Sequence, residues 1–362
     1  MRATNYNFAA GPARLPDTVL EKARETLFVR GPDGASPLER PFTGEDFRAT
    51  LAHARDRLAQ LIDLPDGYHI LFLAGGAMHQ FSLVPMNLLG EARRAAYADS
   101  GYWAQRAMAE AQRYAEVVVA ARFAGSMPLA APPLGDWQLP ADCAYCHITP
   151  NETVEGITYP SLPNTADVPL VADCTSCFLT APMDVSKFGL IYASAQKNIG
   201  PAGLTVLVVR EDLLERPAPQ VPSALSYRLQ AEADSCLNTP PTWAIHLAGL
   251  VFDWIFDAGG LAAMATANRR KADTVYRAID GSGGFYQAPV AAGHRSPSNM
   301  RFHLADADLT EPFLAEAETH GLTNLRGHRR VGGVRASLYN AMPQAGAQAL
   351  TAFMADFSRR HG

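Results

Sequence analysis

The residue whose surroundings most clearly indicate chemistry is Lys197. Only four of the 31 basic residues are lysines, namely Lys22, Lys187, Lys197 and Lys271. Lys197 lies in a small-residue run directly after a stretch typical of a buried strand, whereas the other three occupy charged or helical stretches in which lysines are usually solvated. Desolvation and nearby cations lower the pKa of a lysine and leave a neutral amine that attacks aldehydes. Lys197 is therefore a candidate for a Schiff base with pyridoxal phosphate, and the alternative is a buried, ion-paired structural lysine.

Other residues supply what that cofactor needs. Asp173 ends the apolar run from Pro169, at the edge of a sheet where ligands bind, and its carboxylate can keep a pyridine nitrogen protonated. Trp103 can stack on the ring, although a lone tryptophan is more often a core residue. Thr153 can donate to the ring hydroxyl. A small-residue turn before a helical pattern can bind phosphate through the amides of Gly76, Ala77 and Met78, although alone it is more often structural.

Two cysteine pairs offer a different class of function. Cys143-Ala144-Tyr145-Cys146-His147 matches the attachment pattern of c-type haem, and Cys174 with Cys177 completes a pattern that suggests zinc. Both pairs lie in or beside runs typical of strands, where residues three apart point to opposite faces. We therefore expect small buried hydrophobic side chains and no metal site, with a non-enzymatic metal or haem protein as the alternative.

Length and charge limit the remaining possibilities. The 362 residues, 48% of them hydrophobic, suffice for about two domains. A formal net charge of −5 argues against a nucleic-acid partner. No uncharged apolar run reaches the roughly 18 residues of a membrane helix, and the polar N-terminus does not resemble a signal peptide. Five cysteines, an odd number, fit a reducing compartment, so we expect a cytoplasmic protein without a membrane partner.

The hydrophobic pattern predicts an α/β protein. Helices are expected at 17–30, 45–61, 242–258, 262–279 and 345–360, and strands at 69–73, 117–121, 144–148, 170–173, 190–193, 204–209, 299–304 and 334–339. The alternation predicts a mainly parallel sheet covered by helices, with some antiparallel pairs. We predict a large cofactor-binding domain at 16–258 and a smaller α+β domain formed by 1–15 and 259–362, with the boundary at Gly259-Gly260.

Several long motifs resemble one known family. They are Asn7-Phe8-Ala9-Ala10-Gly11-Pro12, Pro150-Asn151-Glu152-Thr153, Ala195-Gln196-Lys197-Asn198-Ile199-Gly200-Pro201-Ala202-Gly203, Leu237-Asn238-Thr239-Pro240-Pro241-Thr242, and Gly327-His328-Arg329 with Arg335-Ala336-Ser337-Leu338-Tyr339-Asn340-Ala341-Met342-Pro343. Over nearly the whole chain, the sequence resembles the phosphoserine aminotransferases, which are class V, fold-type I enzymes dependent on pyridoxal phosphate.

The resemblance implies a fold, a reaction and a set of site residues. The fold would be that of a fold-type I transferase, and the enzyme would convert 3-phosphooxypyruvate and glutamate to phosphoserine and 2-oxoglutarate in serine biosynthesis. Lys197 would be the Schiff-base lysine, with Asp173 at the pyridine nitrogen. Within one subunit, the cofactor would be contacted by Gly76, Ala77, Met78, Trp103, Thr153 and Gln196. The enzyme would be a homodimer with shared active sites, in which Asn238 and Thr239 of the neighbouring subunit also contact the cofactor. Arg335 would bind the substrate α-carboxylate, and His328 with Arg329 its acidic end.

One segment departs from the family. Pro41-Phe42-Thr43-Gly44 stands where the family carries Ser-His-Arg-Gly, whose His and Arg bind the acidic end of the substrate. Arg40, Thr43 and Arg330 are candidate replacements, and solvated surface charges are the alternative for the two arginines. The departure keeps open a paralogous aminotransferase with another amino donor or keto acid. A cysteine desulfurase or lyase is less favoured because no catalytic cysteine loop is evident. The family also suggests vitamin B6 synthesis for some members.

Overall fold

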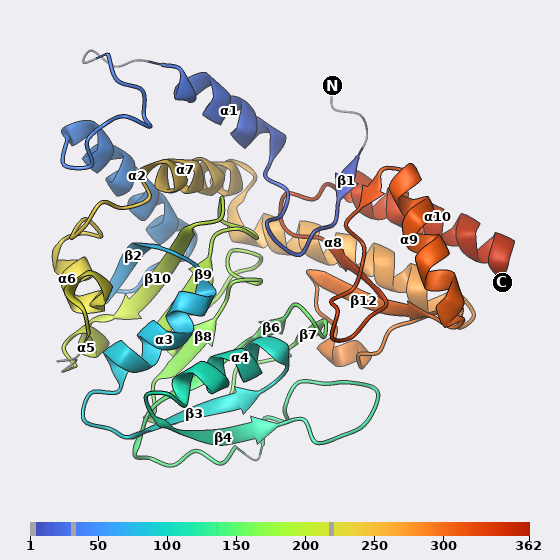
Figure 1. Cartoon of the computed structure of the whole chain (residues 1–362), viewed down its shortest axis with the longest axis horizontal. Coiled ribbons are helices and arrows are strands. Elements are labelled where there is room, and N and C mark those ends of the chain that lie inside the picture. The colour runs from blue at the N-terminus through green and yellow to red at the C-terminus, as the bar shows by residue number, and fades with distance from the viewer. Residues whose placement is uncertain (1–4, 30–33, 136, 217–220) are drawn as a thin grey trace.

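A seven-stranded sheet forms the centre of the larger part of the molecule (Figure 1). The computed structural model describes residues 5–29, 34–135, 137–216 and 221–362. In spatial order the strands are β2 (Tyr68–Ala74), β10 (Leu204–Arg210), β9 (Leu190–Ser194), β8 (Leu170–Asp173), β5 (Cys143–Ile148), β3 (Arg94–Asp99) and β4 (Glu116–Arg122). Strand β10 is antiparallel to both of its neighbours, and every other pair in this sheet is parallel. The mainly parallel α/β prediction is confirmed.

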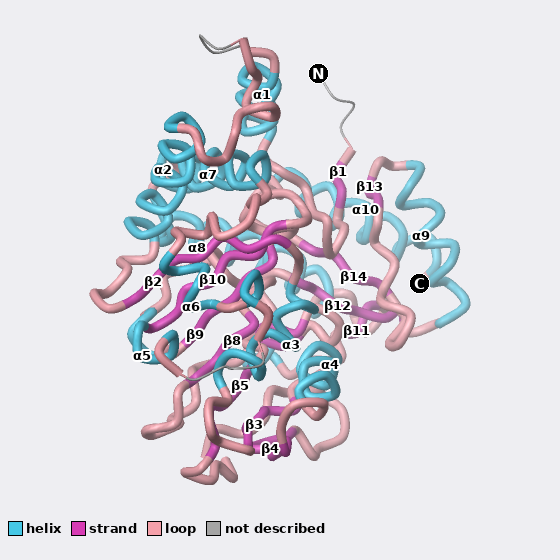
Figure 2. Tube along the Cα trace, turned by 60° about the vertical axis from the view of Figure 1, so that its left-hand side comes forward, coloured by secondary structure: helices cyan, strands magenta, loops and turns pink. Residues whose placement is uncertain are grey.

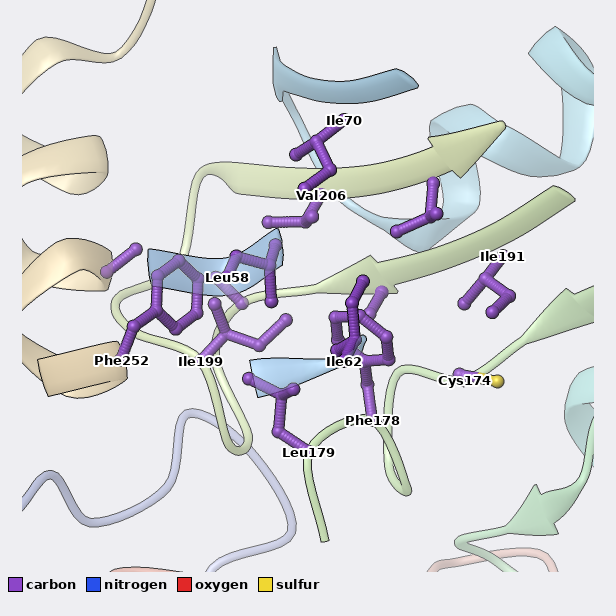
Figure 3. Packing of buried hydrophobic residues seen from close by; sticks show 14 of the residues in the cluster. Leu58, Ile62, Ile70, Cys174, Phe178, Leu179, Ile191, Ile199, Val206 and Phe252 are labelled. Carbon is purple, nitrogen blue, oxygen red and sulfur yellow. The ribbon is translucent and has the colours of Figure 1, made fainter. Parts of the chain in front are cut away.

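Helices cover both faces of this sheet because its strands are apolar on both sides. Ile70 and Phe72 pack with α2 (Glu45–Leu61) and α7 (Thr242–Asp257), and α1 (Asp17–Leu27) contacts α7. The alternate residues Leu71 and Leu73 pack with α3 (Ala77–Leu88) and α4 (Tyr102–Ala111) on the other face. Figure 2 shows these two helical layers on either side of the strands. Figure 3 shows part of the first layer, where side chains of α2, α7 and the sheet meet.

A second, smaller core lies to one side of the sheet. Here α8 (Gly260–Asp280), α9 (Thr310–Thr319) and α10 (Gln344–His361) accompany the antiparallel strands β11 (Tyr286–Gln287), β12 (Asn299–Leu304) and β14 (Val334–Ser337). The N-terminal strand β1 (Tyr6–Asn7) joins this part by pairing with β13 (Leu322–Thr323). Short elements complete the fold, namely β6 (Asn151–Glu152), β7 (Ile157–Thr158), α5 (Glu211–Leu214) and α6 (Tyr227–Glu232).

Helix α8 connects the two cores. Leu261 and Met264 in its first turns pack in the core of the large sheet, whereas Ala272, Val275 and Ile279 pack in the smaller core. The division at residues 258 and 259 stays a prediction. Among the described residues, no single helix has the length and hydropathy to cross a membrane, and only the pair α7 and α8, bent by 83°, passes that test together.

Most predicted elements are present, and a few differ. The predicted strands of the large sheet agree to within one residue at each end, but Arg94–Asp99 was not predicted, although it lies between β5 and β4. The helix predicted at 17–30 ends at Leu27, and the strand predicted at 334–339 ends at Ser337.

The cysteine pairs do not have the predicted geometry. Cys143 pairs with Arg94 and Cys146 with Ala96, so β5 carries one extra residue there, and both cysteines pack in one apolar cluster. The prediction of opposite faces is therefore wrong for this pair. It also fails for Cys174 and Cys177, which lie in a turn after β8, where the Cys177 amide donates to the Cys174 carbonyl at 3.0 Å.

The five cysteine thiols are free, and all but Cys177 are buried. Burial raises the pKa of Cys146 to about 12, as expected for a thiol that packs as a small apolar group. Within the described residues, no group of three or more His, Cys, Asp or Glu side chains is arranged to hold a metal ion.

Lys271 is not the solvated lysine that its helical surroundings predict. The side chain is 2% exposed, and Nζ donates to the Tyr339 carbonyl at 2.7 Å. Next to it, Asn268 Nδ2 donates to Asn340 Oδ1 at 2.8 Å, and the Asn340 amide donates to Asn198 Oδ1 at 3.1 Å. This buried network joins α8 to the residue that follows Lys197.

Candidate active site

Lys197 lies in the turn that connects β9 to β10. Ser194 pairs with Thr205 across these antiparallel strands, and the Ala195 amide donates to the Leu204 carbonyl at 2.9 Å. These two contacts close the base of the turn and hold Lys197 at the carboxyl end of β9. Its Nζ donates to Thr153 Oγ1 at 2.8 Å. The structure therefore brings together two of the predicted site residues that are distant in sequence.

Asp173 occupies the adjacent position in the sheet. It is the last residue of β8 and pairs with Tyr192 of β9. The Thr175 amide donates to Asp173 Oδ1 at 3.0 Å. Burial raises the pKa of Asp173, while the hydrogen bonds from Thr175 and the charge of Lys197 act in the opposite direction. A buried carboxylate that faces a cation suits a protonated ring nitrogen.

The N-terminal segment covers the lysine. The Ala13 amide donates to the Gln196 carbonyl at 2.8 Å. A Cβ added at Gly11 would lie 3.4 Å from Gln196 Cγ and 3.5 Å from Lys197 Cγ, and the φ of Gly11 is +141°, a value that side chains rarely adopt. Gly11 therefore allows the backbone to approach the lysine closely.

The N-terminus of α3 is open to an anion. Gly76 is the N-cap residue, and no side chain among the described residues caps the first amides of this helix. Thr205 Oγ1 donates to the Gly75 carbonyl at 3.1 Å, which fixes this end of α3 beside the lysine turn. Free amides at a helix N-terminus bind phosphate, so Gly76, Ala77 and Met78 fit the predicted phosphate site.

Aromatic and basic groups lie around Thr153. Arg335 Nη1 donates to the Thr153 carbonyl at 3.5 Å. Burial and the charges of Arg335, Arg329 and Arg330 lower the pKa of His328, as expected where cations gather. Trp103 lies at the start of α4, and its Nε1 is buried without a hydrogen-bond partner among the described residues.

Four predicted residues have no recorded contact with the Lys197 group within the described chain. Asn238 Oδ1 accepts from Gln230 Nε2 at 2.9 Å, and both Asn238 and Thr239 are exposed. Arg40 Nη1 is 3.4 Å from Asp46 Oδ2, and Thr43 is exposed.

The donors present fit pyridoxal phosphate: an amine for its aldehyde, a buried carboxylate for its ring nitrogen, a helix N-terminus for its phosphate and an indole beside them. The family model of the class-V aminotransferases matches residues 5–350.

The chain belongs to the class-V aminotransferases.

Among aminotransferases of this class, relatives resemble the chain over its full length. A protein of Acidithiobacillus ferrooxidans named phosphoserine aminotransferase is 48% identical over 366 residues, which is 100% of both chains. One of Stenotrophomonas maltophilia with the same name is 48% identical over 99% of both. The phosphoserine aminotransferase structure from Bacillus circulans has a TM-score of 0.96 and 43% identity over 99% of both chains. A structure described as PLP-bound phosphoserine aminotransferase from Trichomonas vaginalis has a TM-score of 0.92 and 37% identity, covering 97% of this chain and 99% of that one.

The sequence did not point to two residues of this aminotransferase site. Glu152 is buried and Glu155 is half-buried at the first turn of α4, and their carboxylate oxygens accept hydrogen bonds from its amides. The available signal was the pair of acidic residues, three apart, in the segment that follows the strand predicted at 144–148.

Proposed function

We propose that this class-V aminotransferase uses pyridoxal phosphate to convert 3-phosphooxypyruvate and glutamate to phosphoserine and 2-oxoglutarate, a reaction of serine biosynthesis. The names of the full-length relatives support the reaction. The observation that carries the proposal is the placement of Lys197 Nζ 2.8 Å from Thr153 Oγ1, beside Asp173 and the open N-terminus of α3.

The cofactor-binding residues divide by the part of the group that they hold. Lys197 would bond to the aldehyde carbon, Asp173 would pair with the ring nitrogen, and Trp103 would stack on the ring. Thr153 and Gln196 would contact the ring oxygen or ring edge, and the amides of Gly76, Ala77 and Met78 would hold the phosphate. When bound, pyridoxal phosphate withdraws electrons from the substrate α-carbon so that its proton becomes acidic.

Lys197 then acts as general base and general acid. Its Nζ would take the proton from the substrate α-carbon and deliver it to the C4′ carbon of the cofactor, which requires a neutral amine held in one place. Thr153 Oγ1 supplies that position through the hydrogen bond that already exists. Asp173, buried at the end of the strand beside β9, would keep the ring nitrogen protonated.

Basic residues orient the acidic substrates. Arg335 is half-buried next to Thr153, where it can bind the α-carboxylate through two parallel hydrogen bonds. His328 and Arg329 receive the phosphate or the distal carboxylate at the other end of the substrate. The positive charges that lower the pKa of His328 also attract such an anion.

A second candidate is an aminotransferase of the same class with another amino donor or keto acid. The observation that favours it is the position of Phe42, which packs against the large core instead of presenting an acid-binding group. Thr43 is exposed, and Arg40 faces Asp46. The acid-binding set of this chain therefore depends on His328, Arg329 and the nearby Arg330.

Two measurements test these proposals. Borohydride reduction of the loaded protein followed by peptide mapping is expected to place the adduct on Lys197, and an adduct elsewhere would refute the assignment. Values of kcat/KM for phosphoserine and a panel of amino acids test the substrate. Negligible turnover of phosphoserine beside a better donor would establish the second candidate.

We also infer a homodimer in which Asn238 and Thr239 reach the partner's phosphate site. Met78, Leu225 and Leu237 are 52%, 41% and 40% exposed, and a second subunit would cover such side chains. Sedimentation equilibrium should give twice the chain mass. The five free cysteines support a cytoplasmic location, testable by fractionation. Family membership supports a further role in vitamin B6 synthesis, testable by complementation of a pyridoxine-requiring strain.

A further inference from the structure

Two glutamates cap the first turn of α4 from a different part of the chain. Glu152 Oε2 accepts from the Trp103 amide at 3.0 Å, and its Oε1 accepts from the Ala104 amide at 2.9 Å. Glu155 Oε1 accepts from the Tyr102 amide at 3.1 Å. The first three amides of α4, which a helix cannot satisfy internally, therefore bind carboxylates about fifty residues away in sequence.

Glu152 and Glu155 form a close-packed clamp on the first turn of α4, and placing two carboxyl groups there costs free energy. A Cβ at Gly101 would lie 2.6 Å from Glu155 Oε2 and 2.9 Å from Glu152 Cδ, so both carboxyl groups lie against the same point of the backbone. Burial, and then the nearby negative charge of Glu155, raises the pKa of Glu152 to about 8. A serine or aspartate at position 101 could cap the helix without burying two acids, so helix capping alone does not explain the arrangement.

The clamped turn carries two aromatic rings, and one of them contacts the basic segment that includes His328 and Arg330. The ring centroids of Tyr102 and Trp103 are 5.1 Å apart, and Tyr102 also lies 4.9 Å from the His328 ring. The Arg330 guanidinium lies 5.5 Å from the Tyr102 ring centroid. Arg330 Nη2 also donates to Gln105 Oε1 of α4 at 2.8 Å. One helical turn therefore supports both the ring proposed to stack on the cofactor and the basic segment proposed to bind acidic substrates.

We propose that Glu152 and Glu155 are positioning residues that fix the first turn of α4 and so orient the Trp103 ring and the Tyr102 surface on which His328 and Arg330 rest. This inference rests on the proposed stacking of Trp103 on pyridoxal phosphate. Neither glutamate touches the reacting atoms, and both act through the backbone of α4.

The two carboxylates make a matched pair of variants. Both oxygens of Glu152 accept amide protons, so the NH₂ group of Glu152→Gln must face a donor and one hydrogen bond is lost. Glu155 uses only Oε1, and its Oε2 has no hydrogen-bond partner in the described chain, so Glu155→Gln keeps its bond to Tyr102. Glu110→Gln, which changes a carboxylate near the other end of α4, is the control.

The test is a titration of each apoprotein with pyridoxal phosphate, followed by tryptophan fluorescence and near-ultraviolet circular dichroism. We expect Glu152→Gln to weaken cofactor binding at least about 10-fold and to alter the tryptophan signal, because one buried amide of α4 loses its hydrogen-bond acceptor. Glu110→Gln should stay within about 3-fold of wild type, and Glu155→Gln, which keeps its bond to Tyr102, should lose less affinity than Glu152→Gln. Wild-type affinity in Glu152→Gln, or equal losses in all three variants, would overturn the proposal.

Two further variants complete the design. Trp103→Ala tests the stacking of Trp103 separately from the role of the two glutamates. Wild-type cofactor affinity in that variant would refute the stacking role itself. If Trp103→Ala weakens binding and Glu152→Gln does not, only the clamp is refuted. Tyr102→Leu covers the case in which Glu152→Gln fails to fold. It should raise KM for phosphoserine about 10-fold with a smaller change in kcat, and an unchanged KM would count against the link to His328 and Arg330.

Discussion

Lys197 Nζ donates a 2.8 Å hydrogen bond to Thr153 Oγ1, and this contact joins the β9–β10 turn to the segment that follows β5. The same Thr153 residue accepts a hydrogen bond at its carbonyl from Arg335 Nη1. One threonine therefore touches both the proposed catalytic amine and the proposed carboxylate-binding guanidinium.

Thr153→Val removes the hydroxyl and keeps the side-chain shape. Because the variant loses the hydrogen bond that positions the amine, we expect kcat/KM for phosphoserine to fall at least about 10-fold. Steady-state kinetics measure the change. Thr158→Val, which removes a hydroxyl bond to the Pro150 carbonyl nearby, is the control and should have a smaller effect. Equal losses in the two variants would argue against a specific role for Thr153.

Arg335→Lys keeps the charge but loses the planar pair of donors. We expect KM for both amino donor and keto acid to rise at least about 10-fold with a smaller change in kcat, because a lysine cannot bind a carboxylate through two parallel bonds. Arg326→Lys, at an exposed ion pair with Glu311, is the matched control. An unchanged KM in Arg335→Lys would remove this residue from the substrate site.

Lys271→Met tests the buried amine. Burial lowers the pKa of Lys271 from 10.5 to about 7. At a pH below the folded-state pKa, the amine is charged in both the folded and the unfolded chain. The free energy of unfolding is then reduced by the full cost of burying the charge. Between the two values the unfolded chain binds more protons, and wild-type stability gains up to about 1.4 kcal/mol per pH unit as the pH rises.

The methionine variant lacks this titration. Relative to wild type, it should therefore be most stable near about pH 6 and lose that advantage by about pH 9. Thermal unfolding across this range measures the difference. Lys187→Met, at an exposed lysine, is the control variant measured over the same range. A flat difference for Lys271→Met would show that the lysine keeps an ordinary pKa.

Asn340→Ala should destabilise the fold by about 2 to 4 kcal/mol, because it leaves buried polar groups without partners. Asn340 Nδ2 donates to the Leu179 carbonyl at 2.8 Å, and its Oδ1 accepts from Asn268. Denaturant unfolding of the apoprotein provides the measurement. Asn164→Ala at an exposed turn is the control and should cost under about 1 kcal/mol. Similar costs for both variants would mean that the network contributes little.

The sequence alone predicted the features that depend on residues close together in the chain. The helix at 45–61 has the predicted bounds, and Lys197 was distinguished by small neighbours after an apolar strand. Strand β3 was not predicted because alanines dominate Arg94–Asp99 and give no strand signal, so its pairing with β4 and β5 overrides local preference.

Features that depend on distant contacts could not be predicted. The extra residue in β5 that aligns Cys143 with Cys146 depends on pairing with β3. Lys271 occupies an amphipathic helix, and its burial follows from the carbonyl of Tyr339, which approaches from another element. The roles of Glu152 and Glu155 likewise require knowledge of where α4 begins in space.

The reversed direction of β10 makes the lysine turn a hairpin. Ser194 and Thr205 become partners across the short connection 195–204, whereas the parallel strands β8 and β9, which bring Asp173 to the site, are joined by the longer segment 174–189. Such a local closure loses little chain entropy, so the lysine-bearing turn can assemble early in folding while the rest of the site awaits long-range pairing. Length changes in this turn would thus alter the reach of the amine without disturbing the order of the sheet.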